Sequence, residues 1–112
     1  MASIFTEIIN GAIPCYKVYE DDKILCFHDL DPQAPVHALI IPKKHIASMD
    51  EVAAEDLELM GYIMTKIKDI AKILELENGY RVVNNCGADG GQTVHHIHFH
   101  LLARRNLAWP PG

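Results

Sequence analysis

Residues 95–102 constrain the fold more than any other part of the chain. They read His-His-Ile-His-Phe-His-Leu-Leu, so imidazole and apolar side chains alternate along most of the segment. Because alternate side chains of a β-strand lie on opposite faces, this spacing predicts a strand with His96, His98 and His100 on one face. The apolar residues between them would lie on the other face, packed under a helix.

These three histidines, here called the histidine row, are poorly suited to a hydrophobic core. Each imidazole brings two polar nitrogens that need partners when they are buried. The row also follows a glycine-rich loop, Gly87–Thr93. Glycines let a backbone approach a ligand closely, and consecutive N–H groups can form a nest for an anion. The combination predicts a functional site that binds phosphate.

The residues alone leave two kinds of chemistry open for the row. Two histidines one residue apart can ligate zinc, with His28 or His37 as a third ligand and Asp29 as an acidic partner. Alternatively, one neutral imidazole attacks a phosphorus atom while a neighbouring histidinium stabilises the phosphoryl charge. The adjacent glycine-rich loop favours catalysis on a phosphorus centre.

The rest of the chain predicts an α+β fold with an antiparallel sheet of about five strands. Apolar residues at helical spacing predict a short helix over residues 4–9, ended by Asn10-Gly11. A long helix is predicted from near Asp50, after the S-x-x-E capping sequence Ser48–Glu51, to Asn78-Gly79. Besides residues 95–102, strands are predicted at residues 15–19, 23–28, 36–41 and 80–84.

Composition bounds the class of protein. A length of 112 residues predicts one domain spanning residues 1–112, and the net charge of −5 argues against binding a nucleic acid polymer. The cysteines at positions 15, 26 and 86 are odd in number and form no C-x-x-C pair, which favours a reducing compartment. Met1–Phe5 lacks the pattern of a secretory signal, and no apolar stretch approaches the roughly 20 residues that span a bilayer. We therefore expect a cytoplasmic protein with no membrane contact.

Several segments together resemble the histidine-triad superfamily. Residues 96–102 match its pattern H-φ-H-φ-H-φ-φ, in which φ is apolar, and the resemblance runs from about Ile4 to the last residue. A histidine at position 100, where the nucleotidyltransferase branch has glutamine, resembles a hydrolase. The Hint branch is indicated by Phe27-His28-Asp29, Gln33-Ala34-Pro35, His37, Ile41-Pro42-Lys43-Lys44-His45, Asp89-Gly90-Gly91-Gln92 and Trp109-Pro110-Pro111-Gly112.

This resemblance implies a homodimer whose sheet continues across the interface, and an enzyme that needs no cofactor and no metal. The implied activity is that of a purine nucleoside phosphoramidase, which hydrolyses the P–N bond of adenosine or guanosine 5′-monophosphoramidates. The implied ligands are purine mononucleotides and their phosphoramidates. His98 would be the nucleophile that forms a nucleotidyl-histidine, and His100 would contact the phosphate. His37 and His96 would set the orientation and charge of the row.

The resemblance also implies a set of nucleotide contacts. Asp29 would hold the ribose hydroxyls as a carboxylate acceptor. The apolar members of the set would form a slot for the base, and Asn85, Gly91 and Thr93 would contact the phosphate or the leaving group. The complete predicted set is Phe5, Ile8, Phe27, His28, Asp29, Leu30, Asn85, Gly91, Gln92, Thr93, His98 and His100.

Three alternatives remain open: a nucleotide-binding regulatory or scaffold protein with little catalysis, a dinucleoside polyphosphate hydrolase, and a zinc-binding regulatory protein. The intact row argues against the first, because binding alone does not need the nucleophile. The ending Trp109–Gly112 resembles the Hint branch rather than the second. Cys86 and His95 have no assigned role, His95 is predicted to point away from the row, and His45 is predicted to lie on the surface.

Overall fold

The computed structural model describes residues 3–112. Met1 and Ala2 lie outside the described residues. Both belong to the predicted domain, and both belong to the segment Met1–Phe5, whose pattern predicts that no secretory signal is present. Within residues 3–112, none of the helices has the length and apolar character needed to cross a membrane.

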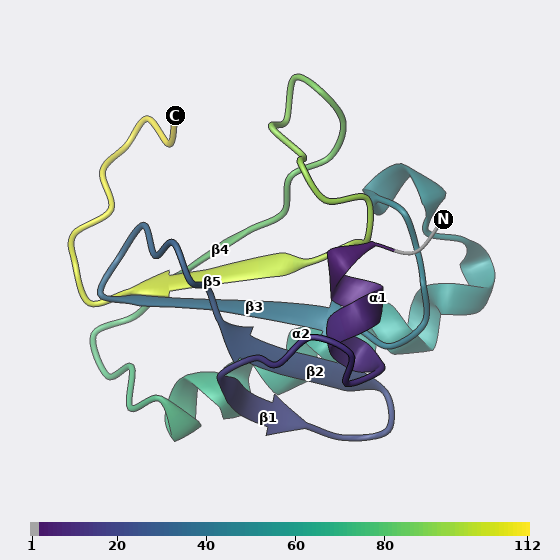
Figure 1. Cartoon of the computed structure of the whole chain (residues 1–112). Helices are drawn as coiled ribbons and strands as arrows, with labels where there is room; N and C mark the ends of the chain where they lie inside the picture. The colour runs from purple at the N-terminus through teal and green to yellow at the C-terminus, as the bar shows by residue number, and fades with distance from the viewer. Residues whose placement is uncertain (1–2) are drawn as a thin grey trace.

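Five strands of the described chain form one antiparallel sheet in the order β1-β2-β3-β5-β4 (Figure 1). They are β1 (Lys17–Glu20), β2 (Ile24–His28), β3 (Val36–Pro42), β4 (Arg81–Val83) and β5 (Phe99–Ala103). The predicted α+β fold with an antiparallel sheet is therefore confirmed. The central strand β3 pairs His28 with Ala38 and His100 with Leu39, so the end of β2 and the histidine row lie close together.

The short helix α1 (Ile4–Ile9) forms where the sequence predicts it. The Ser3 Oγ accepts a hydrogen bond from the Thr6 N–H at 3.2 Å and so caps the helix. Gly11, with φ of 79°, adopts the left-handed conformation that turns the chain away from the helix axis. Helix α1 packs against one face of the sheet, where Phe5 of the helix joins a buried cluster with Leu25, Phe27, Leu39 and Ile41.

The long helix α2 (Leu57–Ile73) is shorter than predicted at both ends. The predicted capping box is wrong, because the Ser48 side chain makes no capping hydrogen bond and two short 3₁₀ helices, η1 (Met49–Glu51) and η2 (Ala54–Asp56), precede α2. The Asp56 carboxylate instead accepts from the Ala53 N–H at 3.0 Å. At the other end, Glu75 adopts φ of 59° and stops the helix before Asn78-Gly79.

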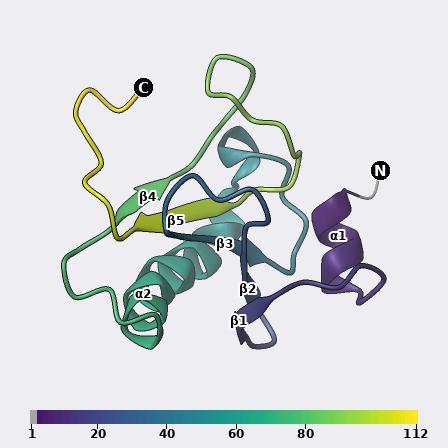
Figure 2. The same ribbon diagram turned by 60° about the vertical axis from the view of Figure 1, so that its left-hand side comes forward.

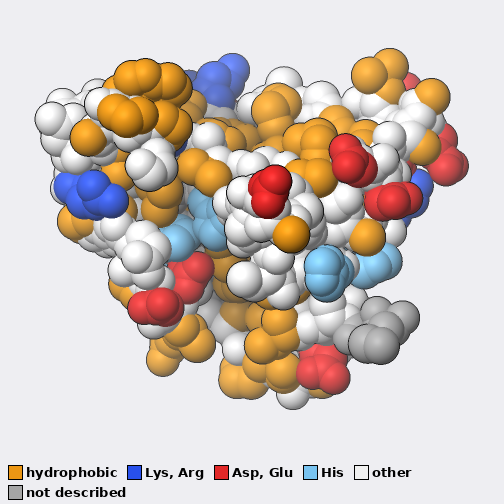
Figure 3. Space-filling model, turned by 90° about the horizontal axis from the view of Figure 1, so that it is seen from above, with side chains coloured by type: hydrophobic (Ala, Val, Ile, Leu, Met, Phe, Trp, Pro, Cys, Tyr) orange, Lys and Arg blue, Asp and Glu red, His pale blue; other side chains and the backbone are white. Residues whose placement is uncertain are grey.

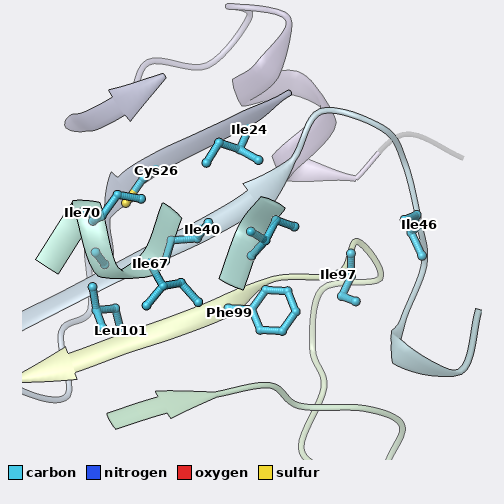
Figure 4. Close-up of a cluster of buried hydrophobic side chains, with 11 residues drawn as sticks. Ile24, Cys26, Ile40, Ile46, Ile67, Ile70, Ile97, Phe99 and Leu101 are labelled. Atoms are coloured by element: carbon cyan, nitrogen blue, oxygen red, sulfur yellow. The ribbon is translucent and has the colours of Figure 1, made fainter. Parts of the chain in front are cut away.

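Helices α1 and α2 cover opposite faces of the sheet (Figure 2). Successive strand residues alternate between the two clusters: Ile24 and Cys26 of β2 face α2, while Leu25 and Phe27 face α1. Figure 4 shows the larger cluster, which consists of Ile24, Cys26, Ala38, Ile40, Ile46, Ile63, Ile67, Ile70, Ile97, Phe99 and Leu101.

The strand predicted at residues 95–102 is too long, because β5 begins only at Phe99. The β3 ladder ends where Ile40 pairs with Phe99, and residues 95–98 lie outside it. The Ile97 N–H donates to the Ile46 carbonyl at 2.7 Å instead of to a strand partner. The side chains nevertheless keep alternating, since Ile97 joins the α2 cluster while His98 contacts Phe5 on the α1 face.

Candidate active site

A cavity of about 630 Å³ lies on the α1 face of the sheet. Figure 3 shows histidine atoms at the bottom of a hollow, beside hydrophobic and acidic side chains. The residues predicted to bind nucleotide that line this cavity are Phe5, Ile8, Phe27, His28, Asp29, Leu30, Thr93, His98 and His100. The fold thus gathers residues from α1, the end of β2, the loop before β5 and β5 itself around one cavity.

The sequence did not predict one part of the cavity wall. Ile13, Pro14, Cys15 and Tyr16 also line it, because the chain doubles back after α1 before it enters β1. This path depends on the packing of α1 against the sheet, and the local residue pattern gives no signal for it. The aromatic part of the wall is compact, since the Phe5 and Phe27 ring centroids are 5.7 Å apart in an edge-to-face arrangement.

A second cavity, of about 790 Å³, lies beyond the C-terminal end of β5. Residues 75–81 and 102–107 line it, and none of these described residues belongs to the predicted site. Although this cavity is larger, it contains no histidine, so the chemistry that the sequence predicts belongs to the smaller one.

His98 has the tautomer of a nucleophile. Its Nδ1 lies 2.8 Å from the backbone carbonyl oxygen of His96. A carbonyl oxygen only accepts hydrogen bonds, so Nδ1 must carry the proton and donate it. In a neutral imidazole the other nitrogen, Nε2, then carries the lone pair. The Phe5 ring packs edge-to-face against the His98 ring at 5.0 Å and holds it on the cavity wall.

His100 is oriented through His37. The Gln33 N–H donates to His37 Nδ1 at 3.0 Å, so the proton of the neutral His37 ring is on Nε2. That Nε2–H donates to His100 Nδ1 at 2.8 Å. The neutral His100 ring therefore carries its own proton on Nε2, where it can donate to an anionic oxygen.

Asp29 closes the same end of the cavity. Its Oδ1 accepts from the Asp31 N–H at 2.8 Å, and its Oδ2 lies 3.5 Å from His37 Nε2. The side chain is 23% exposed, whereas the His37 side chain is only 4% exposed. A partly exposed carboxylate on the cavity wall can still accept hydrogen bonds from a ligand.

His96 does not face the cavity, which corrects the prediction that all three row histidines face one open pocket. The residue is fully buried, and its Nε2–H donates to the Pro42 carbonyl at 2.8 Å. Its Nδ1 lies 3.3 Å from Nδ1 of His45, a residue from the loop after β3. His96 therefore lies behind His98, where it ties the row to the end of β3.

Burial keeps the histidines of the site neutral. It is the main cause that lowers the pKa of His37, His96 and His98 below the ordinary value of 6.5. The pKa of His100 falls to about 4, first through burial and then through the neighbouring His98 and His37. In the free protein, burial thus disfavours the histidinium that was predicted to stabilise phosphoryl charge.

Three N–H groups of the glycine-rich loop are used inside the loop and so are not available to the predicted anion nest. The N–H groups of Gly91 and Gln92 donate to carbonyls inside the loop, and the Gly87 N–H donates to Gln92 Oε1. The Gln92 Nε2 donates to two further carbonyls, and the Asn85 Nδ2 donates to the Gly90 carbonyl. Asn85, Gly91 and Gln92 thus maintain the loop and lie outside the cavity lining, whereas Thr93 reaches it.

Three side chains lie close enough together to be considered as metal ligands, but their present arrangement does not fit zinc. One ligand atom each from Asp29, His37 and His100 lie within 4.8 Å of one another. However, His37 Nε2 and His100 Nδ1 share a proton at 2.8 Å. Tetrahedral zinc with Zn–N bonds of about 2.0 Å holds its donor atoms about 3.3 Å apart and needs both lone pairs. His37 Nε2 and His100 Nδ1 would have to move apart, and the proton between them would have to leave, before both nitrogens could bind zinc.

Comparison with known proteins decides the family. A model of the HIT domain matches residues 10–107 of this chain. The chain belongs to the HIT domain family. The predicted superfamily is therefore confirmed, while the assignment of this HIT domain to the Hint branch stays a prediction.

Relatives of this HIT domain have different functional descriptions. A 14 kDa zinc-binding protein of Zea mays is 49% identical over 112 residues, which cover 98% of this chain and 88% of the relative. The crystal structure of a HIT family hydrolase from Legionella pneumophila is 49% identical, with a TM-score of 0.96 over 99% of this chain and 100% of that one. A histidine triad nucleotide-binding protein from Candida albicans is 34% identical, with a TM-score of 0.84 over 97% of this chain and 83% of that one.

Proposed function

We propose that this HIT domain protein is a purine nucleoside phosphoramidase. It hydrolyses the P–N bond of adenosine or guanosine 5′-monophosphoramidates through a nucleotidyl intermediate on His98. The observation that carries the proposal is the 2.8 Å contact between His98 Nδ1 and the His96 carbonyl oxygen, which requires the proton on Nδ1 and leaves the lone pair on Nε2. The resemblance to a hydrolase structure and to a nucleotide-binding protein supports the same conclusion.

The first step forms the covalent intermediate. The Nε2 lone pair of His98 attacks phosphorus, and the P–N bond of the substrate breaks with its electron pair going to the leaving nitrogen. That nitrogen takes a proton from solvent and departs as an amine. The charge that develops on the phosphoryl oxygens is stabilised by the His100 Nε2–H, because the His98 and His100 ring centroids are only 5.0 Å apart.

The second step releases the nucleotide. Water attacks phosphorus, the P–Nε2 bond breaks and its electron pair returns to His98, while the proton of the water passes to solvent. The product is a nucleoside 5′-monophosphate. Because the intermediate contains a P–N bond like the substrate, the first step exchanges one P–N bond for another and the two states are similar in free energy.

The cavity supports a mononucleotide as the ligand. Its volume of about 630 Å³ lies within the range that small-molecule sites occupy. The apolar wall formed by Phe5, Ile8 and Phe27 suits a purine ring, and Asp29 suits the ribose hydroxyls.

The proposal includes a homodimer and a cytoplasmic location. Strand β4 lies at one edge of the sheet, so a second copy could pair with it and continue the sheet (Figure 1). Val82 on β4 is 38% exposed, and Tyr80 just before it is 43% exposed. The cysteines of the described chain are all free, which suits a reducing compartment.

A substrate panel tests the proposed reaction. Purified protein is offered AMP and GMP linked to an amine fluorophore, and a dinucleoside polyphosphate, each with and without EDTA. We expect hydrolysis of the phosphoramidates that survives chelation. Nucleotide binding without turnover would instead indicate a regulatory or scaffold protein. Turnover of the polyphosphate alone would indicate the other hydrolase class.

The zinc alternative has its own outcome in the same panel. If EDTA abolished turnover and added zinc restored it, the row would be a metal site and the nucleophile assignment would be wrong. If the protein bound zinc without any turnover, the description of the Zea mays relative would fit this chain better than the proposed hydrolase.

A further inference from the structure

We propose that His45 is a positioning residue for the nucleophile His98 and acts through the buried His96. The inference rests on the proposed hydrolase function for its kinetic consequence, but its structural part is independent of the reaction. His45 was predicted to be a surface residue, and it is exposed. Its Nδ1 nevertheless lies 3.3 Å from Nδ1 of His96, and the two ring centroids are 5.1 Å apart.

His96 needs the donor that His45 supplies. His96 is fully buried, and its Nε2–H is already used by the Pro42 carbonyl. The remaining ring nitrogen, Nδ1, carries a lone pair and can only accept. His45 Nδ1–H is the donor that reaches it within the described chain. Without that donor, a buried acceptor would be left unpaired, which is costly because it also has no contact with water.

The His96 ring in turn holds the peptide unit that orients His98. The carbonyl of the peptide unit between His96 and Ile97 accepts the His98 Nδ1–H, and its N–H donates to the Ile46 carbonyl. This peptide lies before the start of β5, so no strand ladder holds it. Its position depends on the contacts that join residues 96–97 to residues 42–46, and the His45–His96 hydrogen bond is one of them.

Side-chain variants separate this role from a general effect on folding. His45→Phe keeps an aromatic ring but removes the donor. His45→Asn places an amide N–H near the former Nδ1, since both atoms are bonded to Cγ, and so restores the donor. His95→Phe is the matched control, because His95 is also an exposed histidine next to His96. Each variant is assayed for hydrolysis of AMP-amine, and histidine ring tautomers are read from ¹⁵N NMR spectra.

We expect His45→Phe to lower kcat about tenfold, while KM changes less than about twofold, because the nucleophile is misaligned but the nucleotide contacts remain. The ¹⁵N spectrum of that variant should lose the fixed Nδ1–H signature of His98, and the His96 Nδ1 resonance should shift because that nitrogen no longer accepts a hydrogen bond. His45→Asn should restore both kcat and the spectrum. His95→Phe should match the unmodified protein in both.

Several results would overturn the inference. A folded His45→Phe protein with normal kcat and unchanged tautomers would make His45 an ordinary surface residue. Loss of activity that His45→Asn does not restore would indicate a steric effect of the ring. If His45→Phe does not fold, the spectrum of the unmodified protein still decides, since a protonated His96 Nδ1 would contradict the proposed hydrogen bond. If the unmodified protein hydrolyses no phosphoramidate but the tautomers respond as expected, the proposed function fails while the positioning role stands.

Discussion

At the scale of single residues, hydrogen bonds to the backbone differentiate histidines that look alike in the sequence. The His96 carbonyl fixes the proton of His98 on Nδ1, and the Gln33 N–H places the proton of His37 on Nε2. His98 is thereby left with a lone pair on Nε2, whereas His100, next to His37, is left with a donor. The proposed roles of nucleophile for His98 and electrostatic stabiliser for His100 rest on these contacts.

Replacing His98 tests the covalent step. His98→Ala should reduce turnover by at least about a thousandfold, while the affinity for AMP changes little, because loss of a nucleophile affects the transition state more than the ground state. Steady-state kinetics and calorimetric titration with AMP measure the two effects separately. Near-normal phosphoramidase activity in this variant would mean that the covalent mechanism fails even though the fold is correct.

Replacing Asp29 tests the ribose contact. Asp29→Ala should weaken AMP binding by about 1–3 kcal/mol, which is the usual contribution of hydrogen bonds to a charged acceptor. Titration with a 2′,3′-dideoxy analogue of AMP is the control, since a ligand without the hydroxyls should lose much less affinity. An equal loss for both ligands would show that Asp29 acts through His37, which lies 3.5 Å from it, and not through ribose.

Acid should destabilise the protein through the same histidines. The pKa of His100 falls from 6.5 to about 4 on folding, so the unfolded chain binds protons at a higher pH than the folded protein does. The free energy of unfolding should therefore be constant above about pH 6.5 and decrease as the pH falls toward 4. For one such group, the decrease is about 1.4 kcal/mol for each pH unit that separates its pKa in the unfolded and folded protein.

Urea denaturation between pH 7 and about pH 4.5 measures how the free energy of unfolding changes with pH. This range lies above the pH at which most carboxylates titrate. His100→Asn should flatten the slope, because the variant removes the group with the largest shift among the row histidines. An unfolding free energy that stays constant over this range would show that these histidines titrate normally in the folded protein.

At the scale of elements, hydrogen bonds within the loop before β5 hold its shape. Gly90 is the tightest point, since a Cβ there would lie 2.3 Å from the carbonyl oxygen of Cys86 and 2.8 Å from the Cys86 nitrogen. Both atoms belong to the backbone and cannot move aside without changing the loop. The loop therefore sets where Thr93 enters the cavity wall.

The variant Gly90→Ala should consequently lower the stability of the protein by about 1–3 kcal/mol, as overpacking usually does. Thermal unfolding measures the loss, and AMP-amine hydrolysis should fall with it because Thr93 is displaced. Asp89→Ala is the control from the same loop, as Asp89 is exposed. Equal stability for the two variants would show that the loop adapts easily to a side chain at position 90.

At the scale of the whole molecule, the edge of the sheet at β4, which is one of its two edges, is the surface where we expect a partner. Strand β4 has only three residues and pairs with β5 on one side. An unpaired strand edge exposes backbone donors and acceptors that another chain can satisfy. A second copy of the chain is the partner that the family resemblance implies.

We therefore expect a homodimer in solution. Light scattering at micromolar concentration should give twice the chain mass of 12.5 kDa. Val82→Lys should shift the equilibrium toward monomer, because lysine on an edge strand disfavours pairing with another strand. Thr65→Lys on the exposed side of α2 adds the same charge away from β4 and is the control. A monomer mass for the unmodified protein would contradict the proposed assembly.

Local sequence patterns determined the elements and the two faces of the sheet. Helix α1 and the separation of Ile97 from His98 follow from spacing, because residues that are near in sequence set which side of the backbone each side chain occupies. The antiparallel pairing follows from the order of the predicted elements, in which strands come in runs. The cavity wall residues on α1 and at the end of β2 were likewise predicted, since the family resemblance implies them as nucleotide contacts.

Tertiary structure decided what each imidazole does. The pairs His37–His100 and His45–His96 join residues that are 63 and 51 positions apart, so they depend on how β3 and the loop after it lie beside β5 and the segment before it. The same packing buries His96, while hydrogen bonds inside the glycine-rich loop use the N–H groups of Gly87, Gly91 and Gln92. Spacing fixes the direction of a side chain, but hydrogen-bond partners and burial arise only when distant segments meet.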